Sequence, residues 1–319
     1  MKSIGSRLCI AVACILIWAT AGGADTPPPW AYVANSPEFK PPADDGTIRR
    51  VPGSSAGYTL TNVRDRFLAP DWHSADYPAL PEVVARGRKP NVFACGFCHR
   101  ADGPGGPENA NLTGLPASYI SQQMLDFKSG ARKSSVPTLA PQTLKAQLAQ
   151  AITMEDIEAA AAYFSSIKPR SIVRVVEATT VPKTYGSSGH LTALKSADSE
   201  PIGERIIEVP EDAEQFVSRD TRARFVAYVP PGSIKKGEAL AATGGGKTQQ
   251  CSICHGPNLK GLGPIPGIAG RSPSYIVRQL YDIKHGTRAG AGSALMKASV
   301  EKLTVDDMIA LAAYAASLP

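Results

Sequence analysis

Two cysteine pairs, each followed directly by a histidine, carry the clearest chemistry in this sequence. Residues 95–99 have the sequence Cys-Gly-Phe-Cys-His, and residues 251–255 have the sequence Cys-Ser-Ile-Cys-His. Two thiols at this spacing both form thioethers with one porphyrin, and the adjacent imidazole then lies under the iron as its proximal ligand. A redox-active cysteine pair and a zinc knuckle are the alternatives, but neither requires histidine in that position twice. The sequence predicts two covalently bound haem c groups, held by Cys95, Cys98, His99, Cys251, Cys254 and His255.

The two motifs belong to an internal repeat with an offset of 156 residues. The match runs without a gap through residues 95–132 in the first copy and residues 251–288 in the second. In each copy, apolar residues at helical spacing predict a short amphipathic helix that ends at a glycine. A second matched helix is expected to begin at Thr153 or Thr304, because each threonine precedes an acidic residue by three positions.

Each unit resembles a small class I cytochrome c, and the pair resembles the tandem, c4-like two-haem cytochromes of the periplasm. The resemblance covers residues 81–168 and 230–319. It implies a mainly α fold, with a few helices wrapped around each haem and a methionine before the last helix as the sixth iron ligand. Met296 occupies that position in the second unit. The resemblance also implies that a proline carbonyl holds the proximal histidine; Pro266 matches this proline, and Ala110 stands at its place in the first unit.

The first unit lacks the expected methionine. Met296 lies eight residues before the capping threonine, and the same count in the first unit leads to Lys145. A lysine must lose its proton before it binds iron. His73 and His190 lie outside the repeats and are chemically better substitutes, whereas Met124 is expected to pack on a core-facing helix. The sequence leaves four alternatives for the sixth position of haem 1: His73, His190, Lys145 or an open iron.

Two arginines, Arg132 and Arg288, are matched across the repeats. They are expected either to contact haem propionates through bidentate hydrogen bonds or to be solvated charges. The matched tyrosines, Tyr119 and Tyr275, are expected to complete the packing of their helices.

The start of the chain predicts export. Residues 1–21 have two cations, then an apolar run at residues 8–19, then Ala-Thr-Ala, which together predict a secretory signal peptide cleaved near Ala21. The run is shorter than the roughly 20 apolar residues that span a bilayer, and no later segment is long enough. The mature chain is therefore expected to lie in the periplasm without a transmembrane segment.

The remaining segments connect the repeats. Residues 22–80 are rich in Pro, Gly and polar residues and predict an extended N-terminal arm. Residues 81–88 and 233–242 are expected to form the helices that open the two units. Residues 169–229 predict a small β-containing connector, with short strands at residues 172–176, 205–209 and 224–229.

Composition and charge restrict the partners. With 43% hydrophobic residues the chain has enough apolar side chains for packed cores. Removal of the signal peptide leaves 34 − 2 = 32 cations against 28 anions, a net charge of +4. The excess lies toward the C-terminus, since residues 230–319 have ten Lys or Arg and five Asp or Glu. Such a basic face would steer an acidic redox protein, whereas no dense basic run indicates nucleic acid.

These observations predict a periplasmic two-haem cytochrome that transfers single electrons from a dehydrogenase or membrane complex to a downstream acceptor. An electron carrier is favoured over a stand-alone enzyme, because the sequence contains neither a hydrolytic triad nor a nucleotide-binding loop. The missing methionine keeps one alternative open, a peroxidase-like or sulfur-oxidising haem enzyme with haem 1 as its reaction centre. Another alternative is the cytochrome subunit of a larger dehydrogenase.

Overall fold

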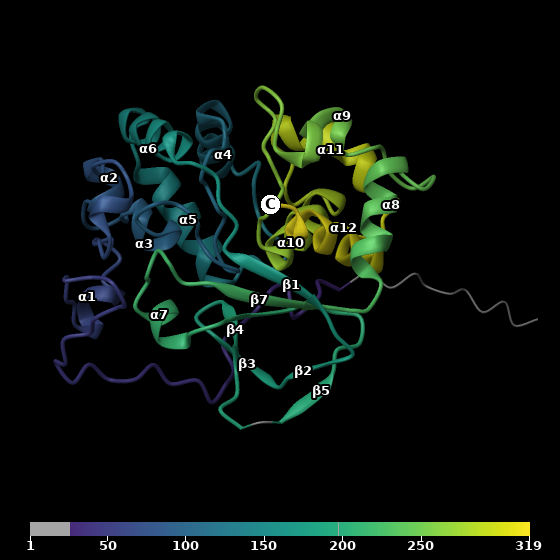
Figure 1. The fold of residues 1–319 in the computed structure, drawn as a ribbon. Coiled ribbons are helices and arrows are strands. Elements are labelled where there is room, and N and C mark those ends of the chain that lie inside the picture. Colours follow the sequence, from purple (N-terminus) through teal and green to yellow (C-terminus); the bar gives the residue numbers. More distant parts are fainter. Residues whose placement is uncertain (1–25, 197) are drawn as a thin grey trace, which may run out of the picture.

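Two helical units and a β-containing connector make up the computed structural model, which describes residues 26–196 and 198–319. Figure 1 shows the units side by side, with strands of the connector running beneath both. The predicted signal peptide, residues 1–21, lies outside the described residues. Within the described part of the chain, no helix is long and apolar enough to cross a membrane.

The two units repeat the same order of helices. The first contains α2 (Glu82–Ala85), α3 (Cys95–His99), α4 (Ala117–Ser129), α5 (Ala140–Ala151) and α6 (Met154–Ser166). The second contains α8 (Ser233–Thr243), α9 (Ser252–His255), the 3-10 turn η2 (Pro257–Leu259), α10 (Pro273–Lys284), α11 (Ala291–Val300) and α12 (Val305–Ser317). The fold is thus mainly α, with two tandem helical units that follow the same order of elements.

The last helix of each unit begins as predicted. Thr153 caps α6 and Thr304 caps α12, and each threonine exchanges hydrogen bonds with an aspartate three residues later, Asp156 or Asp307. This reciprocal arrangement satisfies backbone groups that a helix start otherwise leaves unpaired. The capping boxes fix where α6 and α12 begin, and therefore how the segments before them approach the cavity described below.

The opening helices differ between the units. Helix α8 packs across α12 so closely that a Cβ on Gly237 would lie 1.9 Å from the carbonyl oxygen of Ala310, so only glycine fits at this crossing. Helix α2 is shorter than the predicted helix over residues 81–88. The chain leaves the helix at Arg86 and turns back, with Arg88 and Val92 paired in a backbone bridge.

The connector forms a three-stranded sheet in the order β1-β7-β6, built from β1 (Val173–Glu177), β7 (Phe225–Val229) and β6 (Ile207–Pro210). Strand β7 pairs in parallel with β1 and antiparallel with β6. Phe225, Ala227 and Val229 belong to the same buried apolar cluster as α10 and α12. The three predicted strands therefore exist, and this shared core explains why the connector is not a flexible tether.

Smaller elements complete the connector and the arm. Two short antiparallel pairs join β2 (Thr180–Pro182) to β5 (Ser199–Pro201) and β3 (Thr184–Ser187) to β4 (His190–Ala193), and α7 spans Ala213–Val217. Over residues 26–80, the arm's helical elements are α1 (Leu60–Arg64) and the 3-10 turn η1 (Ser74–Asp76). It is tied to the connector by a 2.7 Å hydrogen bond from Trp72 Nε1 to the carbonyl oxygen of Ser218. A 2.7 Å hydrogen bond from the Tyr32 hydroxyl to Asp282 ties it to the second unit.

Candidate haem sites

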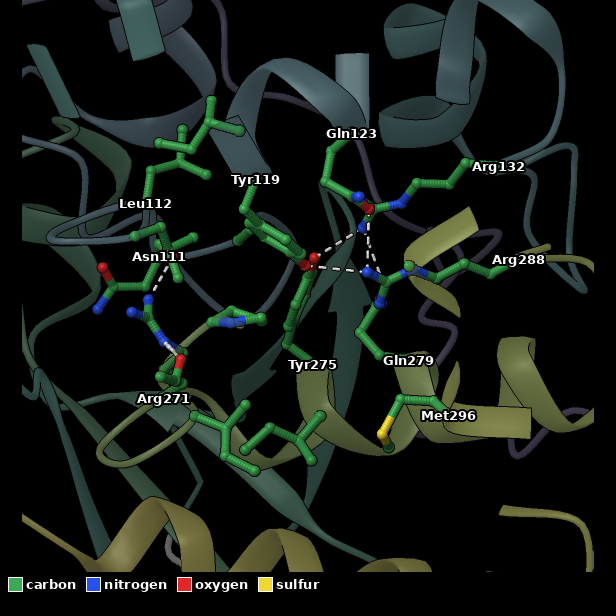
Figure 2. A pocket seen from close by; sticks show the side chains of 18 of the residues that line it. Asn111, Leu112, Tyr119, Gln123, Arg132, Arg271, Tyr275, Gln279, Arg288 and Met296 are labelled. Atoms are coloured by element: carbon green, nitrogen blue, oxygen red, sulfur yellow. Dashed lines mark hydrogen bonds between the residues drawn. The ribbon is translucent and has the colours of Figure 1, made fainter. Parts of the chain in front are cut away.

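One cavity of about 330 Å³ is shared by the two units. Apolar side chains from both units form most of its wall, and both sequence motifs open onto it. Some of the lining residues are drawn in Figure 2. The motif residues that line this cavity are Cys95, Cys98, His99, Cys251, Cys254 and His255. The structure therefore brings together all six residues that the motifs single out.

The four cysteines lie in or next to the short helices α3 and α9, so the two thiols of each pair are one helical turn apart. None of the four is in a disulfide. Burial raises the pKa of Cys95 to about 12, and burial also raises the pKa of Cys98 and of Cys251. Residues 26–196 and 198–319 contain no group of three or more His, Cys, Asp or Glu side chains arranged to hold a metal ion. This arrangement is unlike a zinc knuckle or a reactive thiolate pair.

Each motif histidine is oriented by a backbone carbonyl. His99 donates from Nδ1 to the carbonyl oxygen of Ala110 at 2.8 Å, and His255 donates from Nδ1 to that of Pro266, also at 2.8 Å. With the proton on Nδ1, the lone pair of Nε2 is available for a metal. Burial lowers the pKa of His99 to about 3 and lowers that of His255, which favours the neutral imidazole. In the first unit, the Ala110 carbonyl accepts the histidine hydrogen bond that the family resemblance assigns to a proline carbonyl. Alanine can replace proline here because only the backbone oxygen takes part.

These features fit haem c. Each motif presents to an apolar cavity a pair of free thiols for the vinyl groups of a porphyrin and one oriented imidazole for its iron.

The candidate sixth ligands lie on matched helices. Met296 reaches into the cavity from α11 (Figure 2). Lys145 lines the same cavity from α5 in the first unit. Burial, together with the charge of Arg132, lowers the pKa of Lys145 to about 8. Met124 on α4 also lines the cavity, as does Leu280 at the matched position on α10.

The other two candidate histidines lie elsewhere. His73 Nε2 is 3.0 Å from Asp220 Oδ1, and both side chains are only 1% exposed, in the contact between arm and connector. His190 is buried in the connector, with its ring centroid 4.1 Å from that of Phe216 and its Nε2 3.0 Å from Thr192 Oγ1. Neither histidine is among the cavity-lining residues.

Known proteins resemble this chain in sequence. Cytochrome c-554(548) from Halomonas halodenitrificans is 36% identical over 78 residues, which are 24% of this chain and 94% of that protein. Cytochrome c4 from Stutzerimonas stutzeri is 26% identical over 232 residues, covering 70% of this chain and 83% of that protein. The chain belongs to the tandem two-haem cytochromes c. Its cofactors are two covalently bound haem c groups.

A further relative is the thiosulfate dehydrogenase electron acceptor from Thiomonas intermedia (strain K12). It is 25% identical over 233 residues, covering 72% of this chain and 81% of that protein. No family model matches the chain.

In this cytochrome, the matched arginines cross between the two units (Figure 2). Arg132 donates from Nη2 to the Tyr275 hydroxyl and to Gln279 Oε1, both at 3.0 Å. Arg288 donates from Nη2 to the Tyr119 hydroxyl and to Gln123 Oε1, both at 2.9 Å. Burial alone would raise the pKa of Tyr275, but the charges of Arg132 and Arg288 lower it. Both arginines are therefore partnered and partly or fully buried, not solvated.

Sequence reasoning missed part of this network. Gln123 and Gln279, which match each other across the repeat, accept hydrogen bonds from both arginines. It also missed Arg271, which lines the cavity and donates to the carbonyl oxygens of Asn111 and Thr113 in the first unit. The perfect match of the glutamines was the available signal, whereas Arg271 has no matched partner and gave none.

Proposed function

We propose that this cytochrome carries single electrons in the periplasm, from a dehydrogenase or membrane complex to a downstream carrier or oxidase. The observation that carries this proposal is the shared cavity, onto which both Cys-x-x-Cys-His motifs open with their imidazoles already oriented. Haem c supplies reversible one-electron chemistry at its iron when bound. The protein holds both groups in one enclosure, so an electron received at one site has a short path to the other.

The proposal assigns roles to the cavity residues. His99 and His255 are the proximal ligands, because the carbonyls of Ala110 and Pro266 fix their tautomers. Met296 is the sixth ligand of haem 2, because it enters the same cavity from α11. A thioether opposite histidine raises the reduction potential of haem iron.

Arg132 and Arg288 are assigned to the haem propionates where the two sites meet. Both line the cavity. Arg288 Nε is buried and has no hydrogen-bond partner in the described part of the chain, which leaves one donor for an anion. Two guanidinium groups here would offset the charge of propionates taken out of water.

The two haem edges differ in access. Phe97 lies between the cysteines of the first motif and is 7% exposed. Arg219 of the connector covers it, with its guanidinium carbon 3.6 Å from the ring centroid and a 2.7 Å hydrogen bond to the Phe97 carbonyl. Ile253 occupies the matched place in the second motif and is 63% exposed. The second unit therefore offers the accessible edge for a redox partner.

The surface around this edge indicates the charge of that partner. Besides Ile253, Leu262 and Leu295 are more than half exposed. Leu295 lines the cavity, and Leu262 follows the second motif closely in sequence. Lys260 and Lys297 are exposed, and each lies close in sequence to one of these leucines. An apolar patch flanked by cations is suited to an acidic protein, which long-range attraction would steer to the haem edge.

The relatives suggest a donor class. One relative is named as the electron acceptor of a thiosulfate dehydrogenase, so we assign this cytochrome an enzyme that oxidises a reduced sulfur compound as its donor. Mature cytochrome with two haems would be mixed with a thiosulfate dehydrogenase and thiosulfate, and haem reduction followed by stopped flow. If neither haem is reduced in this mixture, the assigned donor class is wrong.

The docking face is tested by charge reversal. The double variant Lys260→Glu/Lys297→Glu is expected to slow bimolecular reduction about tenfold at low salt, with little effect at high salt. The control Lys168→Glu/Lys195→Glu changes the net charge equally at exposed positions in the first unit and the connector. Equal slowing by both double variants would show that overall charge, rather than this face, controls docking.

A further inference from the structure

Helices α5 and α11 are equivalent elements. Helix α5 begins at Ala140, thirteen residues before Thr153, and α11 begins at Ala291, thirteen residues before Thr304. The sixth residue of α5 is Lys145, and the sixth residue of α11 is Met296. The segment between Arg132 and the start of α5 is longer than the matched segment between Arg288 and the start of α11. Both helices nevertheless begin at the same distance from the capping threonine.

Both residues also face the same space. Lys145 lines the shared cavity together with His99, and Met296 lines it together with His255. The neighbours on the helices correspond as well: Leu144 and Leu148 line the cavity, as do Leu295 and Ser299. The first unit therefore holds a primary amine at the place where the second unit holds a thioether.

The surroundings of Lys145 do not supply an alternative partner. No ion pair within residues 26–196 and 198–319 involves Lys145, whereas Lys236 and Lys247 each pair with an aspartate. The nearby charge of Arg132 opposes a second cation there. The carboxylate of Glu108 acts on this amine through its charge, but it forms no ion pair with it among the described residues. An amine that lines an apolar cavity without an ion-pair partner is suited to donate its lone pair to a metal.

The rival ligands lack this equivalence. His73 and His190 have polar partners away from the cavity. Met124 lines the cavity, but its counterpart Leu280 does so in a unit that already holds Met296. The position of Met124 on α4 and of Leu280 on α10 therefore forms part of the cavity wall in both units and does not mark an iron ligand.

We infer that Lys145 Nζ is the sixth ligand of the haem 1 iron, opposite His99, while haem 2 has His255 and Met296. This inference rests on the proposed haem attachments and deepens them. A nitrogen donor stabilises the oxidised iron more than a thioether does, so haem 1 has the lower reduction potential of the two. The protein then contains two unlike electron sites.

The first test is spectroscopic and uses the mature protein with both haems attached. Near-infrared magnetic circular dichroism and electron paramagnetic resonance of the oxidised protein distinguish amine from thioether ligation. We expect one thioether-ligated and one amine-ligated low-spin haem per chain. Two thioether-ligated haems, a bis-histidine haem, or a five-coordinate high-spin haem would each overturn the assignment.

Two variants of Lys145 test the assignment, one by introducing a thioether ligand and one by removing the amine. Lys145→Met is expected to double the thioether signal and to raise the lower of the two potentials, whereas Lys145→Ala is expected to let one of the two reduced haems bind carbon monoxide. The control Met124→Leu is expected to change neither signal. The inference is wrong if Lys145→Met leaves the thioether signal unchanged, or if Met124→Leu removes a ligand.

Haem content separates this inference from the proposed function. Each variant is analysed for covalent haem by mass and by the pyridine haemochromogen assay. Two haems per chain with an unchanged spectrum in Lys145→Ala would refute the ligand and leave the two-haem carrier intact. Fewer than two haems in the unaltered protein would refute the attachment on which both rest.

Discussion

Arg132 and Arg288 lie opposite each other in an antiparallel backbone bridge at the contact between the two repeats. Flanking backbone hydrogen bonds extend the bridge, from Lys133 to Thr287 at 2.7 Å and from Ala289 to Ala131 at 2.8 Å. Because the bridged residues are equivalent in the repeat, each unit uses the same surface to contact the other. The contact is therefore a pseudo-symmetric interface, and it places the two haem sites at one cavity.

This interface is expected to stabilise the protein through its buried charges. Arg288→Leu would leave the Tyr119 hydroxyl and Gln123 Oε1 without one donor each. Loss of a buried charged donor costs about 3 kcal/mol, so we expect the thermal midpoint to fall by roughly 5 °C. Differential scanning calorimetry of the two-haem protein measures this shift.

The control for Arg288 is Arg174→Leu. Arg174 pairs with Glu211 at 3.4 Å, but its side chain is 59% exposed, and such pairs contribute less than about 1 kcal/mol. If both variants lower the midpoint equally, the interface network contributes no more than a surface ion pair.

The cysteine pairs are expected to act independently. Replacing Cys95 and Cys98 with alanine should halve the covalent haem content, because the second pair lies on a separate helix, α9, with its own imidazole. The corresponding change of Cys251 and Cys254 is the matched control and should retain haem 1 instead. Intact-mass measurement after denaturation counts the attached groups, and retention of both in either variant would rule out the thioether assignment.

Met296 is expected to control the spectrum of one haem only. Met296→Ala should convert haem 2 to a high-spin or misligated form while both haems remain attached, since attachment depends on α9 and not on α11. Leu295→Ala changes the preceding, 75% exposed residue of the same helix and serves as the control. An absorption spectrum that Met296→Ala leaves unaltered would remove the ligand assignment.

Much of this architecture follows from local sequence signals. The motif spacing, the gapless repeat and the Thr-x-x-Asp pattern predict the attachment helices, α4, α10 and the starts of α6 and α12, because each depends on nearby residues. The connector strands were predicted to within two residues from runs of branched residues. What the sequence could not give was long-range: the partners of Arg132, the cover that Arg219 places over Phe97, and the burial of His73 against Asp220. Each joins residues more than 100 positions apart, and no local pattern specifies such a pair.

The second unit is expected to lose stability as the pH falls, because of Asp307. This aspartate accepts from the Thr304 backbone and hydroxyl and pairs with Lys247 at 2.7 Å. Burial opposes its charge, but the bonds from Lys247 and Thr304 hold its pKa well below the usual range. The unfolded chain therefore takes up this proton first, and the stabilisation is complete above the ordinary carboxylate pKa near 4 and declines below it.

Asp307→Asn isolates this contribution. The variant should lose about 2 kcal/mol near pH 7 and less at about pH 3, because the unfolded chain has begun to take up the proton there while the folded protein still holds Asp307 ionised. Asp306→Asn removes the same charge from the neighbouring side chain, which is 58% exposed, and is expected to cost under about 1 kcal/mol. Thermal midpoints measured across this pH range give the difference between the two variants. A difference that stays constant with pH would show that Asp307 stabilises α12 by packing and not by its charge.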